Sequence, residues 1–240
     1  MTYMTIVEII LSLIGIFFAI VLHEVSHGYV AWRLGDPTAR QRGRLTLNPL
    51  AHVDPIGTIV VPLALAFLRF VLGWALPLFG WAKPVPINPN YFKNPYRGML
   101  YVAIAGPTTN IVLALIAAGL GHLLILAAPA AARAGFAALT AFGFVGNLLY
   151  ALLYFLAFFV LWNLILATFN LIPIPPLDGS RILMYFLPPG GRRVLLSLER
   201  YGFLIVLAVV YLGGLGFLFN GIGALWELLL GTPWAIVLLS

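Results

Sequence analysis

IVEIILSLIGIFFAIVLHEVSHGYVAWRL, residues 6–34, is a long apolar stretch that carries His23, Glu24 and His27 in its C-terminal half. A run of this length can cross the hydrocarbon core of a bilayer, about 30 Å thick, as a tilted helix. Ionisable side chains inside a membrane are costly, and they mark a functional site by default. The stretch therefore predicts a first membrane helix that contains a polar functional site.

The composition extends this prediction to the whole chain. Of the 240 residues, 62% are hydrophobic and 8% are charged, whereas a soluble domain has about 25% charged residues. At roughly 20 residues a crossing, we expect an all-α polytopic membrane protein with about five or six transmembrane helices in a single domain. After residues 6–34, further apolar runs that we expect to span are 99–128, 136–169, 201–219 and 221–239.

The basic residues indicate topology rather than a nucleic-acid surface. The net charge of +6 comes from 13 Lys and Arg, which lie mostly in the gaps between apolar runs. The segment RLGDPTARQRGR, residues 33–44, is rich in arginine, so the positive-inside rule places it in the cytoplasm.

The region between the first two long runs is less regular. Residues 55–82 are apolar but lie between two basic loops, and a single crossing cannot begin and end on one side of the membrane. Pro62, Gly73 and Pro77 interrupt this run, so we expect a re-entrant segment made of short broken helices, which is tolerated where protein or a water-filled cavity covers it. The alternation over residues 44–47 predicts a short membrane-associated strand.

The H-E-x-x-H spacing of residues 23–27 carries the chemistry. On a helix, His23 and His27 project from one face one turn apart, so both imidazoles can reach a single zinc ion. Glu24 would act as general base toward water activated by the metal, and then as general acid toward the leaving amine. Cysteine is absent, so histidine and carboxylate side chains must supply all ligands. The other interpretation is a structural polar cluster.

A catalytic zinc ion usually has three protein ligands and a water molecule. Asp178 is the best candidate for the third ligand, because it follows the long inward run 136–169 at the membrane depth expected for the two histidines. An Asp-Gly turn or a helix N-cap explains this residue equally well, and the roles can coexist. The other acidic residues lie in loops or in ordinary helix contexts: Glu8, Asp36, Asp54, Glu199 and Glu227.

Two further motifs, together with H-E-V-S-H, resemble the site-2 protease family of intramembrane zinc metalloproteases. The stretch FNLIPIPPLDGSRIL, residues 169–183, matches the N-x-x-P-x-P-x-x-D-G motif of that family, and GPTTN, residues 106–110, matches its G-x-x-x-N motif. LNPLAHVDPIGT (47–58) and GWAKPVPIN (80–88) look like segments of its compact bacterial and archaeal members, which have no PDZ or CBS domain. The resemblance covers about residues 15–187.

The resemblance implies an enzyme, a zinc metalloendopeptidase that cleaves transmembrane segments of membrane proteins. His23, His27 and Asp178 would bind Zn²⁺, Glu24 would be the general base, and Asn170 would help to hold substrate or the oxyanion. The catalytic core would span about residues 6–187, with accessory C-terminal spans over about 195–240. The protein would lie in a bacterial or archaeal cell membrane with its active site toward the cytoplasm, and its partners would be a transmembrane-helix substrate and lipid.

Alternatives remain open at this point. A divalent metal-ion transporter could use His23, Glu24 and His27 as a transit site, although a transport path would place ligands on both sides of the bilayer midplane. A catalytically dead scaffold is a third interpretation, and two imidazoles with a carboxylate also suit iron or cobalt. Asn110 and Asn170 could simply join helices by hydrogen bonds. The other two histidines are expected in a turn (His52) and in helix packing (His122).

Overall fold

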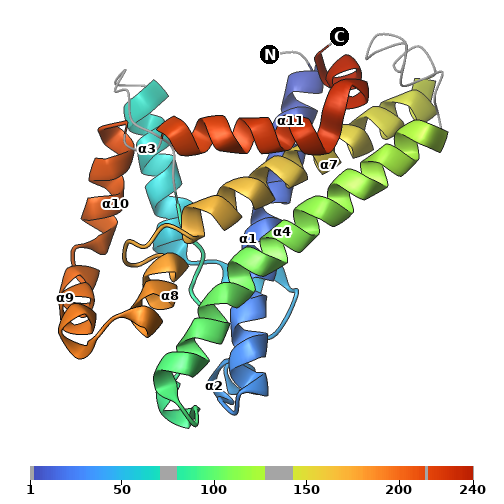
Figure 1. Ribbon diagram of the computed structural model, residues 1–240. Coiled ribbons are helices and arrows are strands. Elements are labelled where there is room, and N and C mark those ends of the chain that lie inside the picture. Colours follow the sequence, from blue (N-terminus) through green and yellow to red (C-terminus); the bar gives the residue numbers. More distant parts are fainter. Residues whose placement is uncertain (1–2, 71–79, 128–142, 214–215, 240) are drawn as a thin grey trace.

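The computed structural model describes residues 3–70, 80–127, 143–213 and 216–239 (Figure 1), and no strand occurs in these ranges. The long helices are α1 (Tyr3–Arg33), α4 (Pro95–Ala127), α7 (Gly143–Asn170) and α11 (Gly216–Leu239). The shorter helices are α2 (Thr38–Gln41), α3 (Val61–Phe70), α8 (Asp178–Phe186), α9 (Pro189–Glu199) and α10 (Gly202–Tyr211). Single helical turns are η1 (Pro49–His52), η2 (Pro55–Val60) and η3 (Pro89–Tyr91).

Helices α1, α4 and α7 form the centre of the molecule. Helices α4 and α7 lie side by side, and α1 packs against both (Figure 1). Within the described ranges, three segments are long and apolar enough to cross a membrane: Val7–Arg33, Pro95–Ala127 and Gly143–Asn170. They correspond to the first three spans expected from the sequence, so the prediction of an all-helical membrane protein is confirmed.

Small residues allow the central helices to approach closely. Ala114, Ala117 and Ala118 of α4 share a buried cluster with Ala157 of α7, and each is at most 4% exposed. Helices in a bilayer associate through such close van der Waals packing, because lipid tails are as apolar as leucine. The closely packed pair of α4 and α7 supports α1, which carries the polar residues.

The C-terminal region differs from the predicted span over 201–219. Helix α10 has 10 residues and so extends about 15 Å, which is too short to cross a core of about 30 Å. Gly213 has a positive φ of 74°, a conformation that favours glycine, and it follows the end of α10. Gly231 also has a positive φ of 70°, which interrupts α11.

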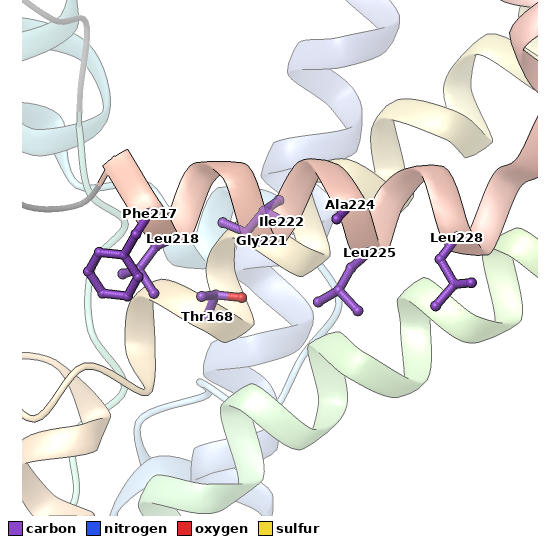
Figure 2. Close-up of a pocket in the computed structure, with 8 residues that line it drawn as sticks. All are labelled: Thr168, Phe217, Leu218, Gly221, Ile222, Ala224, Leu225 and Leu228. Atoms are coloured by element: carbon purple, nitrogen blue, oxygen red, sulfur yellow. The ribbon is translucent and has the colours of Figure 1, made fainter.

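Helix α11 runs across α7 and α4 instead of alongside them (Figure 1). Between α11 and α7 lies an open, apolar pocket of about 470 Å³ (Figure 2). It is lined by Thr168 of α7 and by Phe217, Leu218, Gly221, Ile222, Ala224, Leu225 and Leu228 of α11. None of these side chains titrates, so the pocket has no means of acid–base or metal chemistry.

The predicted strand over residues 44–47 is not formed. The Arg44 guanidinium turns inward and donates hydrogen bonds to the carbonyls of Ala51, Lys83 and Pro84. The Asn48 side chain accepts from the backbone N–H of Leu50 and starts turn η1, so the chain bends at once. The segment is irregular because these contacts with the loop 80–88 replace strand pairing.

Of the predicted re-entrant segment, the structure describes η2 and α3, which are helical as expected. Residues 71–79, which include Gly73 and Pro77, lie outside the described residues, so a return to the same face stays a prediction. The chain from residue 80 to 88 has no regular secondary structure, and its Trp81 and Lys83 N–H groups donate to the carbonyls of Gly57 in η2 and His52 in η1. This attachment brings the segment toward α1.

Candidate metal centre

Three side chains from distant parts of the sequence meet beside α1. His23 and His27 lie one turn apart on α1, and Asp178 is the first residue of α8. The Nε2 atoms of the two histidines are 3.0 Å apart, and each is 3.2 Å from Oδ2 of Asp178. Within the described residues these three form a group that could hold a metal ion.

Hydrogen bonds on the far side of each ring direct both Nε2 atoms toward this meeting point. Nδ1 of His27 donates to the backbone carbonyl of Val102 at 2.7 Å, and Nδ1 of His23 donates to Oδ1 of Asn110 at 2.6 Å. A neutral imidazole that carries its proton on Nδ1 presents a lone pair at Nε2. Each ring is therefore held in the tautomer that can bind a metal.

The donor atoms of the cluster are suited to a positive charge at its centre. Oδ2 of Asp178 is buried and has no hydrogen-bond partner. Two lone pairs and an anionic oxygen facing one another are mutually repulsive unless a cation lies between them.

Zinc fits this donor set. Bonds of about 2.0–2.1 Å at tetrahedral angles place ligand atoms about 3.4 Å apart, close to the separations of 3.0–3.2 Å found here. Two imidazole nitrogens and one carboxylate oxygen are also a ligand set of catalytic zinc sites, which leave a fourth position open. The residues present therefore match the ion in both chemistry and spacing.

Glycines of the family-like motifs explain why the three side chains can meet. A Cβ atom on Gly106 of α4 would lie 2.4 Å from Cε1 of His23 and 2.6 Å from Nε2 of His27. A Cβ atom on Gly179 would lie 2.3 Å from the carbonyl oxygens of Leu171 and Ile172. Only glycine permits these approaches. The first brings α4 against the imidazoles, and the second folds the loop after α7 back onto α8.

Asp178 does not act as the helix N-cap, which was one interpretation of its sequence context. Leu177 occupies the N-cap position of α8 and makes no side-chain capping bond. Asp178 follows in the first turn, where the helix dipole favours a negative charge. Its carboxylate is thus held at a helix N-terminus and directed at the two histidines.

Glu24 has a partner that the sequence did not indicate. Its Oε2 accepts a hydrogen bond of 2.9 Å from the backbone N–H of Val85. Val85 lies between Pro84 and Pro86, neither of which has a backbone donor. A Cβ atom on Gly28, the residue after His27, would lie 2.8 Å from Cγ1 of Val85, so glycine at that position lets the loop reach α1.

The remaining polar residues that the sequence singled out form hydrogen bonds with backbone carbonyls. Asn170 lies at the C-terminal end of α7, where its amide donates to the carbonyl of Leu166 at 3.0 Å, so its role toward substrate stays a prediction. His52 is buried in the η1 turn and bonds to the carbonyl of Thr46 at 3.0 Å. His122 joins α4 to α11 by a 2.7 Å contact with the carbonyl of Leu229, as the packing interpretation predicted.

The sequence reasoning missed one further polar residue near the site. Asn163 of α7 is fully buried and accepts a hydrogen bond from Asn110. Its signal was present, because an amide inside a long apolar run must find a partner in the membrane. The apolar run did not indicate which helix supplies that partner.

Comparisons with known proteins agree with these motifs. The sequence model of peptidase family M50 matches residues 71–212, which include Asn110 and Asp178. A Bacillus subtilis (strain 168) protein named "Putative zinc metalloprotease YwhC" is 40% identical over 188 residues, covering 78% of this chain and 74% of the relative. A Mycolicibacterium smegmatis protein named "Putative zinc metalloprotease Rip2" is 32% identical over 211 residues, covering 83% of this chain and 69% of the relative. No solved structure matches the chain.

Proposed function

Because the chain belongs to peptidase family M50, the site-2 protease family, we propose that it is a zinc metalloendopeptidase that cleaves transmembrane segments of membrane proteins. The observation that carries the proposal is the meeting of His23, His27 and Asp178 with their donor atoms 3.0–3.2 Å apart. His23 and His27 lie on α1, which is long and apolar enough to cross a membrane, and Asp178 lies in the segment that follows α7, another such helix. A peptidase centre at this place would act on chains that reach it from the bilayer.

His23, His27 and Asp178 would hold the zinc ion through Nε2, Nε2 and Oδ2. When bound, zinc would polarise the carbonyl of the scissile bond and lower the pKa of a water molecule. The hydrogen bonds of both Nδ1 atoms keep the imidazoles oriented for this task, and such outer partners usually support both affinity and activity.

Glu24 would act as the general base and then as the general acid. It lies on α1 within the H-E-x-x-H motif, and the Val85 N–H engages one of its two oxygens. This bond orients the carboxylate. The carboxylate would accept a proton from the attacking water and return it to the nitrogen of the leaving amine.

Asn170 would donate to the oxyanion that forms at the substrate carbonyl. It stands at the end of α7, in the same loop motif as Asp178. An amide nitrogen has two protons, and the bond to Leu166 uses one of them. The second proton would be available to substrate.

The active site would face the cytoplasm. The arginines that follow α1 lie at the same end of that helix as His23 and His27, and basic loops are retained in the cytoplasm. The catalytic core would comprise about residues 6–187, with the helices after residue 195 as accessory elements. A transmembrane substrate would have to unwind there before its carbonyls could be attacked, because a helix hides them in internal hydrogen bonds.

Purified protein, reconstituted with a model membrane substrate, tests the proposal. Native protein should bind one equivalent of zinc and cleave the substrate, Glu24→Gln should retain zinc and lose cleavage, and Asp178→Ala should lose both. A metal-ion transporter would instead show no proteolysis in any form and would change its metal flux in the Glu24→Gln variant. Native protein that neither binds metal nor cleaves the substrate would support the interpretation of a catalytically dead scaffold.

A further inference from the structure

Behind His23, away from the metal-facing side of its ring, two buried amides form a continuous hydrogen-bonded row. Asn110 of α4 and Asn163 of α7 are both 0% exposed. Nδ2 of Asn163 donates to the carbonyl of Phe159 at 2.7 Å, and Oδ1 of Asn163 accepts from Nδ2 of Asn110 at 2.8 Å. Oδ1 of Asn110 then accepts from Nδ1 of His23 at 2.6 Å. The row thus joins all three central helices.

The row has a direction, and a helix carbonyl determines it. The Phe159 oxygen can only accept, so the Asn163 amide must present its nitrogen there and its oxygen to Asn110. Asn110 must then present its nitrogen to Asn163 and its oxygen to His23. With an acceptor at that position, the His23 proton stays on Nδ1 and the lone pair stays on Nε2.

Reversal of the row would disable the ligand. If Asn110 turned its NH₂ group toward His23, Nδ1 would have to accept and the ring proton would move to Nε2. That proton would point at the Oδ2 atom of Asp178, which lies 3.2 Å from Nε2, and it would occupy the lone pair needed for a metal. The second contact of the Asn110 nitrogen, with the carbonyl of Ala19, is 3.4 Å long and weak by comparison.

We propose that Asn163 is a positioning residue of the metal centre: through Asn110 it determines the tautomer of His23. The inference rests on the proposed function, because it takes His23 to be a metal ligand. Asn163 itself touches neither metal nor substrate. Loss of an outer hydrogen-bond partner of a ligating histidine typically weakens metal affinity about 10–100-fold, and we expect a loss in this range without the Asn163 oxygen.

The test compares Asn163→Leu with Asn163→Asp. Leucine has a similar size but offers no acceptor to Asn110, so its zinc affinity, measured in detergent by competition with a chelator, should fall about 10–100-fold. Burial in the membrane favours the protonated form of an aspartate, which can donate its O–H to the Phe159 carbonyl and keep an oxygen toward Asn110, so this variant should stay within about threefold of native affinity. Trp162→Phe is the matched control: it removes a 3.0 Å hydrogen bond between α7 and Ser12 of α1 one residue away, and it should leave zinc affinity unchanged.

A second measurement reads the tautomer directly and needs no metal. In zinc-free Asp178→Ala protein labelled with ¹⁵N-histidine, which has 4 histidines in all, no carboxylate attracts a proton to Nε2, so the His23 proton should lie on Nδ1 when Asn163 is present and also in Asn163→Asp. It should move wholly or partly to Nε2 in Asn163→Leu. His23→Gln identifies the signal, and Asn163→Ala replaces the leucine variant if that one does not fold.

The outcomes separate the two proposals. Native zinc affinity and a native His23 tautomer in Asn163→Leu, even with a lower melting temperature, would show that Asn163 only packs α7 against α4, and the inference would be overturned. A tautomer change in zinc-free protein would support the row even if the native chain proved unable to cleave any substrate. Failure of the native chain to bind zinc would overturn the proposed function instead.

Discussion

A methyl group on Gly106 would enter the space that the two metal-facing imidazoles occupy. The new Cβ atom would lie 2.4 Å from Cε1 of His23 and 2.6 Å from both Cε1 and Nε2 of His27, whereas ordinary contact begins at 3.4 Å. At least one ring, or helix α4, would have to move by about 1 Å, and metal–ligand distances tolerate only about 0.2 Å. We therefore expect Gly106→Ala to weaken zinc binding and to lower the rate of cleavage about 100-fold.

Gly119→Ala is the matched control, because it makes the same chemical change on the same helix. A Cβ atom on Gly119 meets nothing within 4 Å, and alanine is favoured over glycine in a helix by about 1 kcal/mol. This variant should bind zinc and cleave substrate as the native chain does. Zinc affinity by chelator competition and cleavage of a reconstituted membrane substrate are measured for both variants beside the native chain.

The result that would refute the reasoning is native zinc affinity in Gly106→Ala. It would mean that the imidazoles do not lie against α4 when the metal is bound, and that the close approach in this structure does not build the site. Equal losses in both variants would point to a general effect of a methyl group on α4 and would also contradict the argument.

Three further predictions follow from other contacts. Gly179→Ala places a methyl group 2.3 Å from two backbone carbonyl oxygens, so we expect destabilisation by more than about 3 kcal/mol, seen as a lower melting temperature together with lost zinc binding. Val85→Pro removes the N–H that bonds to Glu24, so it should slow cleavage about 10-fold while zinc affinity is retained. Val85→Ala keeps the donor and should keep most of the rate. Equal cleavage rates in the two variants would contradict a role of this N–H in orienting Glu24. Treatment with a strong zinc chelator should abolish cleavage, and added zinc should restore it, while a preparation that stays active without metal would contradict the zinc mechanism.

Much of the architecture was predictable because it depends on local physics. A bilayer requires every backbone group to be satisfied within the segment, so long apolar runs become helices, as α1, α4 and α7 do. The spacing of His23 and His27 follows from 3.6 residues per turn. The H-E-x-x-H and N-x-x-P-x-P-x-x-D-G motifs indicated the ligands, and the relatives confirm the family to which these motifs point.

Two predictions made from local patterns were wrong. Residues 44–47 alternate like a strand, but the carbonyls near Lys83 bind Arg44 and remove it from any pairing. The apolar residues 201–219 looked like one span, but a positive φ at Gly213 breaks them after a helix too short to cross.

The sequence by itself determined that this is a helical membrane protein, that two histidines share one helix face, and that few acidic residues could complete a metal site. Only the tertiary structure decided that Asp178 reaches both rings, that Val85 engages Glu24, and that Asn163 stands behind His23. The physical reason is that spacing within a helix follows from its geometry alone, whereas contacts between distant segments depend on where glycines leave room for a neighbour. In this protein Gly106 leaves room for the His23 and His27 rings, and Gly28 leaves room for the Val85 side chain.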